Sequence, residues 1–160
     1  MDTQLKVVDL ATAQRWVATW RLKSEAVVFT NGCFDLLHAG HVTYLEAAAS
    51  CGQRLVVGLN DDASVSRLKG PTRPIQTLAH RARVLAALAC VDAVVAFADD
   101  TPLALILALQ PDVLAKGADY TVEQIVGAQE VLGWGGRVER LALVPNQSTT
   151  GIVQKLQGKP

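Results

Sequence analysis

The sequence predicts an α/β fold, namely a doubly wound sheet of about five parallel strands with helices on both faces. Short apolar runs rich in β-branched residues alternate along the chain with segments in which apolar residues recur every three or four positions. The runs are typical of strands buried on both faces, and the recurring positions are typical of amphipathic helices. Strands and helices that alternate in this way build right-handed crossovers between parallel strands.

The N-terminal part contains a helix followed by one complete βαβ unit. Asp9 is a good N-cap residue and precedes apolar residues spaced by three and four, so a helix is expected over about 9–22. Residues 26–30 and 54–59 are expected to be buried strands, and the pattern between them is helical over 40–49. Because a helical crossover connects them, the two strands should be parallel.

The most loop-like stretch covers residues 60–77, where Gly70, two prolines and several charged residues interrupt the hydrophobic pattern. In doubly wound sheets, ligands bind beyond the carboxyl ends of the strands, and long loops there often carry function. Since this stretch follows a predicted strand, we expect it to border a binding site.

The alternation continues in the C-terminal half. Apolar patterns predict a helix over 78–89, a strand over 93–97 and a helix that begins at Pro102 and ends at Pro111. A short strand is expected at 113–115.

Two more helices and one strand complete the pattern. Thr121 and Gln124 have the spacing of a capping box, which predicts a further helix. The last strand is expected over 138–144, and a final helix near Ser148. The full order is that of a Rossmann-like sheet.

The composition fits a single domain spanning residues 1–160. Hydrophobic residues make up 50% and charged residues 19%, which excludes the disordered class. Lys+Arg 15 balance Asp+Glu 15 and form no long basic run, so no nucleic acid partner is expected.

Cysteine usage and hydropathy indicate a cytoplasmic protein. The three cysteines are an odd number without a C-x-x-C pair, which argues against a disulfide framework. The N-terminus has no signal-peptide pattern, and every hydrophobic run is too short to span a bilayer, so no membrane partner is expected.

The richest chemistry lies between the first predicted strand and its helix, in the segment T-N-G-C-F-D-L-L-H-A-G-H at 30–41. A helix N-terminus offers free N–H groups and a positive dipole end to an anion. Gly32 and Gly40 allow close backbone approach, and His38 and His41 can direct donors at phosphate oxygens. An alternative is a zinc site made by the two histidines and Cys33, although the spacing fits no standard finger and no fourth ligand is evident.

This segment resembles the H-x-G-H signature of the nucleotidylyltransferase superfamily, in the form typical of its cytidylyltransferase-like branch. A second element, Gln147 to Gly151, is similar to the I-S-T-T motif, which contacts nucleotide phosphates in that superfamily. Asn146 and Gln147 stand where some cytidylyltransferases have Arg and Ile. The segments V-G-L-N-D-D, R-L-K-G and L-A-K-G-A-D-Y match, in order, the adenylyltransferase domain of bifunctional heptose-phosphate kinase/adenylyltransferases.

The resemblance implies an enzyme that transfers AMP from ATP to D-glycero-D-manno-heptose 1-phosphate, with the β anomer favoured. The products are ADP-heptose, used for lipopolysaccharide core biosynthesis, and pyrophosphate. It also implies Mg²⁺ as cofactor, held mainly by the ATP phosphates without protein ligands. Since 160 residues leave no room for the kinase domain, we expect a stand-alone enzyme linked functionally to a separate heptose 7-phosphate kinase. Related enzymes are often dimers or larger, so a homo-oligomer is expected.

The resemblance assigns roles to individual residues. The expected catalytic residues are His38, His41 and Lys69. The residues expected to contact the nucleotide and its phosphates are Thr30, Asn31, Gly32, Phe34, Gly40, Arg81, Ser148, Thr149 and Thr150. The residues expected to contact the sugar phosphate are Asp35, Asn60, Asp61, Arg73, Lys116, Gly117 and Asp119.

Several of these residues have ordinary structural alternatives. Solvated surface charge would explain Lys69 and Arg73, and turn chemistry would explain Asp61 and Asp119. Arg81 begins a helix, where its positive charge opposes the dipole, so either an anionic ligand or a surface ion pair is expected beside it.

Two other functions stay open at this stage. Glycerol-3-phosphate cytidylyltransferase, or another sugar-phosphate nucleotidylyltransferase, would share the same fold and motifs. A non-catalytic ATP-binding module would also have phosphate donors, but it could dispense with one histidine or the lysines.

Overall fold

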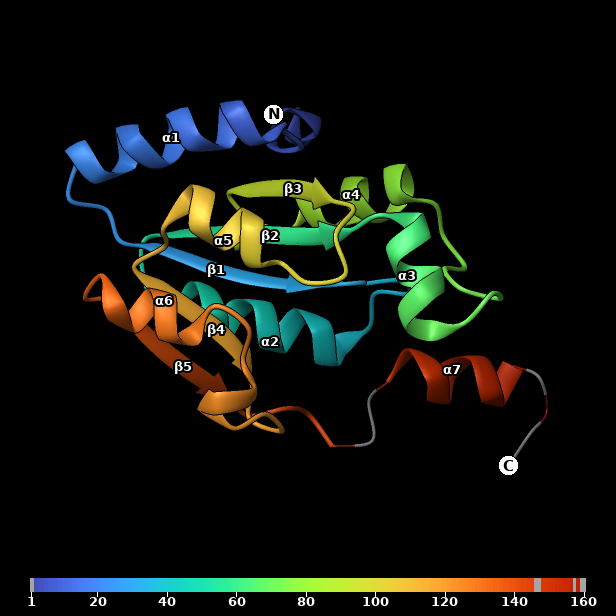
Figure 1. The fold of residues 1–160 in the computed structure, drawn as a ribbon. Helices are drawn as coiled ribbons and strands as arrows, with labels where there is room; N and C mark the ends of the chain where they lie inside the picture. The colour runs from blue at the N-terminus through green and yellow to red at the C-terminus, as the bar shows by residue number, and fades with distance from the viewer. Residues whose placement is uncertain (1, 146–147, 157, 159–160) are drawn as a thin grey trace.

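The computed structural model describes residues 2–145, 148–156 and 158. Within them, one parallel sheet has the strand order β3-β2-β1-β4-β5 (Figure 1). The strands are β1 (Val27–Gly32), β2 (Arg54–Asn60), β3 (Ala93–Phe97), β4 (Val113–Gly117) and β5 (Arg137–Leu141). The predicted doubly wound α/β fold is confirmed.

Helices connect every pair of consecutive strands. The α-helices are α1 (Leu10–Leu22), α2 (Ala39–Ala49), α3 (Asp62–Lys69), α4 (Leu78–Ala87), α5 (Leu103–Leu109), α6 (Ala128–Gly133) and α7 (Thr149–Leu156). Two 3₁₀ helices, η1 (Thr3–Lys6) and η2 (Val122–Gln124), precede α1 and α6. No helix among these is long and apolar enough to cross a bilayer.

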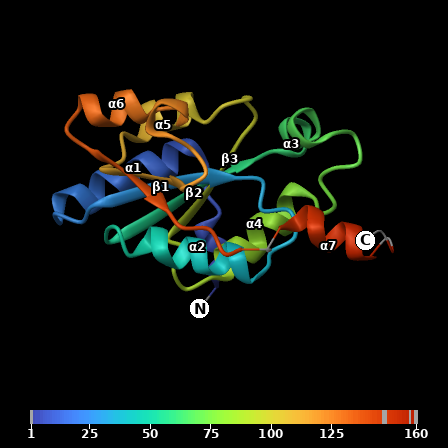
Figure 2. The ribbon, with the colours of Figure 1, turned by 90° about the horizontal axis from the view of Figure 1, so that it is seen from below.

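Helices cover both faces of the sheet (Figure 2). Helices α1, α5 and α6 pack on one face, where they bury Val27 and Phe29 of β1. Helices α2 and α4 pack on the other face against Val28. Side chains alternate across a strand, so β1 contributes to both cores, as a continuous apolar run predicts.

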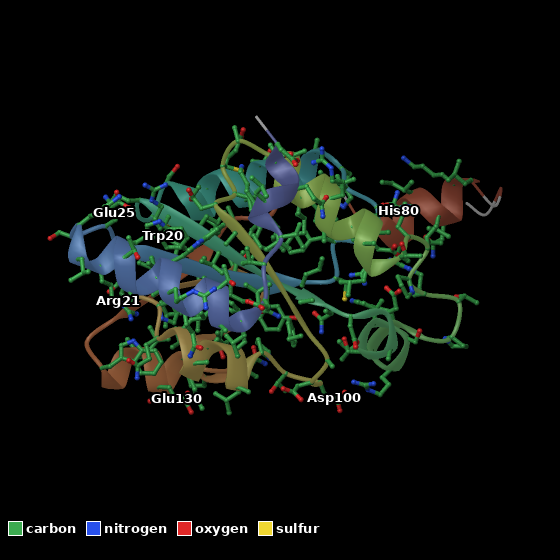
Figure 3. The ribbon with its side chains drawn as sticks, turned by 90° about the horizontal axis from the view of Figure 1, so that it is seen from above. Trp20, Arg21, Glu25, His80, Asp100 and Glu130 are labelled. Carbon is green, nitrogen blue, oxygen red and sulfur yellow. The ribbon has the colours of Figure 1, made fainter. Side chains whose placement is uncertain are left out.

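The amino ends of the strands are joined by a charged network on the side away from the carboxyl ends. Arg54, at the start of β2, donates to Glu25 at 2.7 Å and to Asp92 at 3.0 Å. Its guanidinium also lies 5.5 Å from the ring centroid of Trp20 on α1. Figure 3 shows Trp20 and Glu25 at the same end of the molecule. These contacts fasten α1 to the sheet.

The stretch 60–77 contains a helix that the sequence analysis did not predict. Helix α3 begins after Asp61, whose Oδ1 accepts a hydrogen bond from the Ser64 N–H at 2.7 Å. Only Ser64 and Val65 of α3 are buried. So short an apolar stripe gives little periodicity, and the cap is the one local signal.

The last third differs from expectation in two places. The predicted capping box of Thr121 and Gln124 is present, but the helix it begins is the short η2. Helix α6 follows separately, because Gly127 between them has a φ of 85° that no α-helix accommodates. The last strand was expected to reach Val144, but β5 ends at Leu141. Leu141 pairs with Gly117, the last residue of β4, so no partner strand continues beyond it.

Candidate functional site

A cavity of about 560 Å³ lies beyond the carboxyl ends of β1 and β4. Strand β1 pairs with β2 on one side and with β4 on the other, so the crossover connections diverge here. This is the position at which doubly wound sheets bind ligands. The predicted site residues that line the cavity are Asn31, Gly32, Phe34, Asp35, His38, Gly40, His41, Asn60, Lys69, Arg73, Lys116, Gly117, Asp119, Ser148, Thr149 and Thr150.

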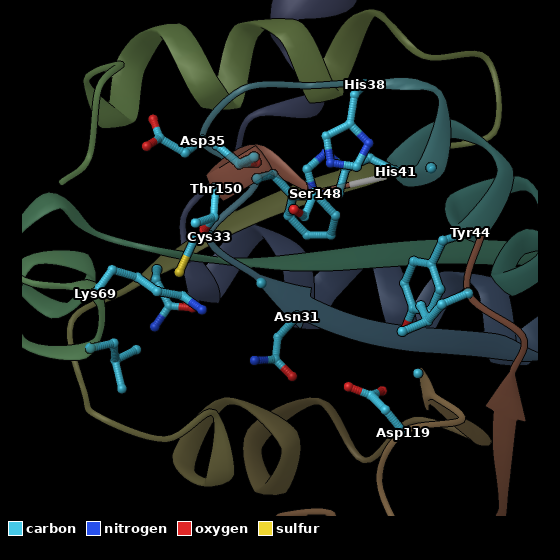
Figure 4. A pocket seen from close by; sticks show the side chains of 18 of the residues that line it. Asn31, Cys33, Asp35, His38, His41, Tyr44, Lys69, Asp119, Ser148 and Thr150 are labelled. Carbon is cyan, nitrogen blue, oxygen red and sulfur yellow. The ribbon is translucent and has the colours of Figure 1, made fainter. Parts of the chain in front are cut away.

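The two imidazoles of the H-x-G-H segment stack on each other (Figure 4). Their ring centroids are 3.8 Å apart, and the ring of Phe34 meets His41 edge-on at 5.2 Å. His38 is the N-cap residue of α2, but its side chain makes no capping hydrogen bond. Within the described part of the chain, both nitrogens of His38 and Nδ1 of His41 are buried without a hydrogen-bond partner.

Burial favours the neutral form of both imidazoles. It lowers the pKa of His38, and together with the neighbouring His38 it lowers the pKa of His41 from 6.5 to about 4. A hydrogen bond with the backbone of Leu36 opposes this shift by raising the pKa of His41. Buried polar atoms without partners are costly, so three such nitrogens in one cavity indicate a site built for a ligand. An anion beside the rings would favour their protonated, donating form.

The N-terminus of α7 reaches the same cavity (Figure 4). Ser148 Oγ accepts a hydrogen bond from the Gly151 N–H at 3.0 Å, and the Thr149 hydroxyl donates to the Leu36 carbonyl at 3.4 Å. The second contact ties α7 to the H-x-G-H loop across 113 residues. The start of α7 and the two imidazoles thus line the same cavity. The preceding residues of the motif, Asn146 and Gln147, lie outside the described residues.

Lys116 lies on the opposite side of the cavity, at the end of β4. Its Nζ donates to Asn31 Oδ1 at 2.9 Å and lies 5.6 Å from the ring centroid of Tyr120. Burial lowers the pKa of Lys116, while the charge of Asp119 opposes that effect.

Asp35 fastens the loop before α4 to the H-x-G-H segment. Its carboxylate accepts hydrogen bonds from Arg73 Nε at 2.6 Å and from the backbone N–H groups of Ile75 and Gln76, each at 2.9 Å. Burial alone would raise the pKa of Asp35, but the hydrogen bonds from Gln76 and Ile75, with the guanidinium, hold it below 3.8. The Asp35 side chain is 1% exposed, so its oxygens are engaged within the protein.

Thr30, Asp61 and Arg81 do not line the cavity. Thr30 shares a buried hydrogen bond with the Tyr44 hydroxyl at 2.8 Å, and Asp61 caps α3. The Arg81 side chain has no exposed surface and pairs with Asp62 at 2.7 Å. The structure contains an ion pair, but the arginine is buried, whereas the sequence analysis expected any such pair to lie at the surface.

Some lining residues were not predicted. They are Cys33, Tyr44, Leu68, Tyr120, Leu143 and Val144. Tyr44 is one of the buried residues of α2, and nothing in the sequence distinguishes it from a core residue. Burial raises the pKa of the Cys33 thiol, so it is a poor nucleophile. No group of three or more His, Cys, Asp or Glu side chains in the described ranges is arranged to hold a metal ion.

Comparison with known proteins gives one family match and several related proteins. The cytidylyltransferase-like family matches residues 29–154. The chain is 62% identical over 154 residues to the bifunctional protein HldE of Magnetococcus marinus, covering 96% of this chain and 32% of that protein. It is 59% identical over 151 residues to the bifunctional protein HldE of Methylobacillus flagellatus, covering 94% and 31%. The chain therefore spans about a third of the length of the curated relatives it matches.

Solved structures share the fold. A lipopolysaccharide core biosynthesis protein from Thermoplasma volcanium GSS1 superposes with a TM-score of 0.61 at 25% identity, over 77% of this chain and 99% of that one. A pantoate-beta-alanine ligase from Francisella tularensis superposes with a TM-score of 0.64 at 15% identity, over 94% and 76%. The family match covers well over half of the residues, from β1 to α7. The chain belongs to the cytidylyltransferase-like family.

Proposed function

We propose that this chain transfers AMP from ATP to D-glycero-D-manno-heptose 1-phosphate, in the β form, and produces ADP-heptose and pyrophosphate. One observation carries the proposal: both ring nitrogens of His38 and Nδ1 of His41 have no hydrogen-bond partner among the described residues, and they share a cavity with the α7 N-terminus and two lysines. Such a set of donors suits a substrate with several phosphate groups. The high identity to bifunctional HldE proteins and the motifs of heptose-phosphate adenylyltransferases support the choice of substrates.

The reaction needs stabilisation of negative charge more than it needs a base. An oxygen of the sugar phosphate attacks the α-phosphorus of ATP, and the bond from that phosphorus to the bridging oxygen breaks. The electron pair leaves with pyrophosphate. The attacking phosphate is already an anion, so no proton has to be removed from it. Catalysis therefore depends on alignment and on donors that face the phosphates.

His38 and His41 are the proposed donors to the reacting phosphate. Their nitrogens project from the start of α2, where the helix dipole also favours an anion. The stack at 3.8 Å holds the two rings in one orientation before ATP arrives. We assign them to the α-phosphate and to the bridging oxygen that carries charge as pyrophosphate leaves.

The remaining phosphate contacts come from three directions. Lys69 is exposed at the end of α3 and lines the cavity, so its ammonium is free to meet the outer phosphates. Ser148 and Thr150 lie beside the imidazoles at the start of α7. Lys116, on the β4 side, is placed to receive the phosphate of the acceptor. Collected donors of this kind reduce the repulsion between two anionic substrates.

Mg²⁺ is proposed to enter with ATP. We assign the ion mainly to the ATP phosphates and not to protein ligands. Of the two carboxylates that line the cavity, Asp35 already accepts hydrogen bonds from Arg73 and the backbone, and Asp119 is exposed. When bound, the ion supplies positive charge that neutralises part of the triphosphate.

The proposal places the enzyme in the cytoplasm of a bacterium, in the synthesis of the heptose-containing core of lipopolysaccharide. The substrate would come from a heptose 7-phosphate kinase, and the relatives called bifunctional are consistent with a second activity in the same route. A homo-oligomer, dimer or larger, belongs to the same proposal.

The test is pyrophosphate release with Mg²⁺, with ATP or CTP as donor and each anomer of heptose 1-phosphate or glycerol 3-phosphate as acceptor. Release with ATP and the β anomer alone is the expected result. Release with CTP and glycerol 3-phosphate would assign the chain to cytidylyl transfer instead. No release from folded protein that binds ATP would favour a non-catalytic module.

A further inference from the structure

Tyr44 lies on α2 one turn after His41, and the proposed phosphate contacts do not use it. Residues three apart share one face of a helix, so the imidazole and the phenol ring project toward the same side. Tyr44 lines the cavity together with both histidines (Figure 4). The residue is nevertheless only 9% exposed, so its hydroxyl needs partners within the protein.

The Tyr44 hydroxyl has two partners, and they belong to two different strands. It donates to the Ala115 carbonyl of β4 at 3.2 Å. It also lies 2.8 Å from Thr30 Oγ1 of β1. A phenol has one hydrogen to donate and the carbonyl takes it, so the Thr30 hydroxyl is the donor in the second bond. These two hydrogen bonds, called the tyrosine bridge below, join α2, β1 and β4 at one oxygen atom.

The tyrosine bridge is suited to a structural task and not to proton transfer. Burial raises the pKa of Tyr44 to about 12, against a smaller opposite effect of the hydrogen bond from Thr30. At neutral pH the phenol therefore keeps its proton and continues to donate to β4. Thr30 and Ala115 have no exposed surface, so water does not compete for either bond.

The bridge lies at the place where β1 and β4 separate. The register of these two strands, both described in full, ends at Phe29 and Leu114, whereas the pairing of β1 with β2 continues to the end of β1. Thr30 and Ala115 are the next residues along the two strands. The Tyr44 hydroxyl thus connects β1 and β4 directly beyond their last paired residues.

The residues that follow the bridge belong to the cavity. Asn31 comes after Thr30, Lys116 comes after Ala115, and both line the cavity. Lys116 Nζ donates to Asn31 Oδ1 at 2.9 Å, so these two side chains move as a pair. The tyrosine bridge therefore connects the helix that carries His41 to the two strand ends that carry this pair.

We propose that Tyr44 is a positioning residue for the adenylyl transfer, because the tyrosine bridge fixes the imidazoles of α2 relative to Asn31 and Lys116. The inference rests on the proposed function, since it takes phosphate groups to lie between these side chains. Alignment of reacting groups contributes large factors to rate, and a displacement of about 1 Å can cost about 10²-fold. Thr30 does not line the cavity, so its influence on turnover passes through Tyr44.

The test breaks the bridge from each end. Thr30→Val keeps the shape of the side chain and removes its hydroxyl, whereas Thr30→Ser retains a hydroxyl. Tyr44→Phe removes the hydroxyl of the ring. Val17→Ala is the matched control, because it removes buried apolar volume from the core on the other face of the sheet.

Two measurements are made on each folded variant. Initial rates of pyrophosphate release give kcat and the KM for MgATP, with β-heptose 1-phosphate as acceptor. NMR signals of the imidazole C–H groups report the stack of His38 on His41 without any substrate. His80 is exposed on α4 and is the internal reference.

We expect Thr30→Val and Tyr44→Phe each to lower kcat about tenfold or more and to leave the KM for MgATP within about threefold. Both should shift the signals of the stacked imidazoles and leave that of His80 in place. Thr30→Ser should recover most of kcat, and Thr30→Val should have little further effect when combined with Tyr44→Phe. Val17→Ala should change neither kcat nor the imidazole signals.

The outcomes separate this inference from the proposed function. Imidazole signals that stay in place in both Thr30→Val and Tyr44→Phe would overturn the positioning role, and so would an equal loss of kcat in Val17→Ala. No pyrophosphate release from the unaltered protein would contradict the adenylyl transfer. Imidazole signals that shift in Thr30→Val and return in Thr30→Ser would still support the positioning role in that case. If Tyr44→Phe does not fold, the two Thr30 variants decide the question.

Discussion

Arg81 and Asp62 form an ion pair at 2.7 Å in which the arginine side chain has no exposed surface and the aspartate side chain is 47% exposed. The same guanidinium donates to the carbonyls of Cys33 at 2.7 Å, Asn60 at 2.8 Å and Gln76 at 3.1 Å. These carbonyls belong to the H-x-G-H loop, the end of β2 and the loop before α4. One buried side chain therefore fixes three walls of the site relative to one another.

Replacing Arg81 should destabilise the fold. Arg81→Met keeps much of the apolar stem but leaves one buried and two partly buried carbonyls without their donor, and the loss of a donor to a buried acceptor costs about 1–3 kcal/mol. We expect a decrease of about 3 kcal/mol or more in the free energy of unfolding, measured by urea titration. Arg83→Met, on the exposed side of α4, is the matched control and should change it by less than about 1 kcal/mol. Equal effects of the two variants would show that the contacts of Arg81 are unimportant.

Removing either imidazole should slow the reaction and leave the fold intact. His38→Ala or His41→Ala removes a donor to charge that develops on the phosphates, an effect of roughly 10²- to 10³-fold in turnover. Single-turnover pyrophosphate release measures the loss, and circular dichroism checks the fold. His38→Asn and His41→Asn retain a donor and should recover part of the rate. Near-normal turnover in both alanine variants would remove the histidines from the mechanism.

Acid should destabilise the ligand-free protein through His41. Its pKa falls from 6.5 to about 4 on folding, so the unfolded chain binds more protons between these values. Stability is therefore lost as the pH falls through that window, and this loss is complete below about 4. Urea titrations at about pH 7 and about pH 5 should show a smaller loss for His41→Asn than for the unaltered protein. His80→Asn, at an exposed position of α4, should behave like the unaltered protein.

Asp35→Asn should loosen the loop at 70–76. All the hydrogen-bond partners of the carboxylate are donors, namely Arg73 Nε and the N–H groups of Ile75 and Gln76. An amide in its place would direct its own N–H₂ group at one of these donors. We expect a decrease of about 3 kcal/mol in stability, because the variant leaves the largely buried Arg73 without its charge partner. Faster proteolytic cleavage within the loop is the direct measurement. Asp99→Asn, at an exposed residue after β3, supplies the control, and the same cleavage rate in both variants would contradict the prediction.

Much of the fold could be predicted because its signals are local. Strand β1 is a continuous apolar run, and α1 has both an N-cap and an apolar stripe. The end of β5 could not be predicted, because β5 ends where its partner β4 ends. That pairing joins residues far apart in the sequence, so no local pattern reveals it. Helix α3 was missed because it buries only two side chains.

The site could be predicted where residues adjoin in sequence. His38 caps α2 and His41 lies in the first turn of that helix, and both line the cavity. The role of Arg81 depends on contacts with residues 5 to 48 positions away in sequence, and no local pattern reveals them. Tyr120 was not predicted as a lining residue, because its position beside Lys116 follows from the turn after β4.

Helix α7 supplies Thr149 and Thr150 to the cavity but buries none of its described residues. The hydrophobic interior is therefore complete once β5 has joined the sheet. During synthesis, the sheet and its covering helices can fold before α7 has emerged from the ribosome. A chain at that stage would resist proteases almost as well as the finished protein while lacking one group of phosphate contacts. Binding competence is thus acquired after the architecture, with the C-terminal helix that the structure describes.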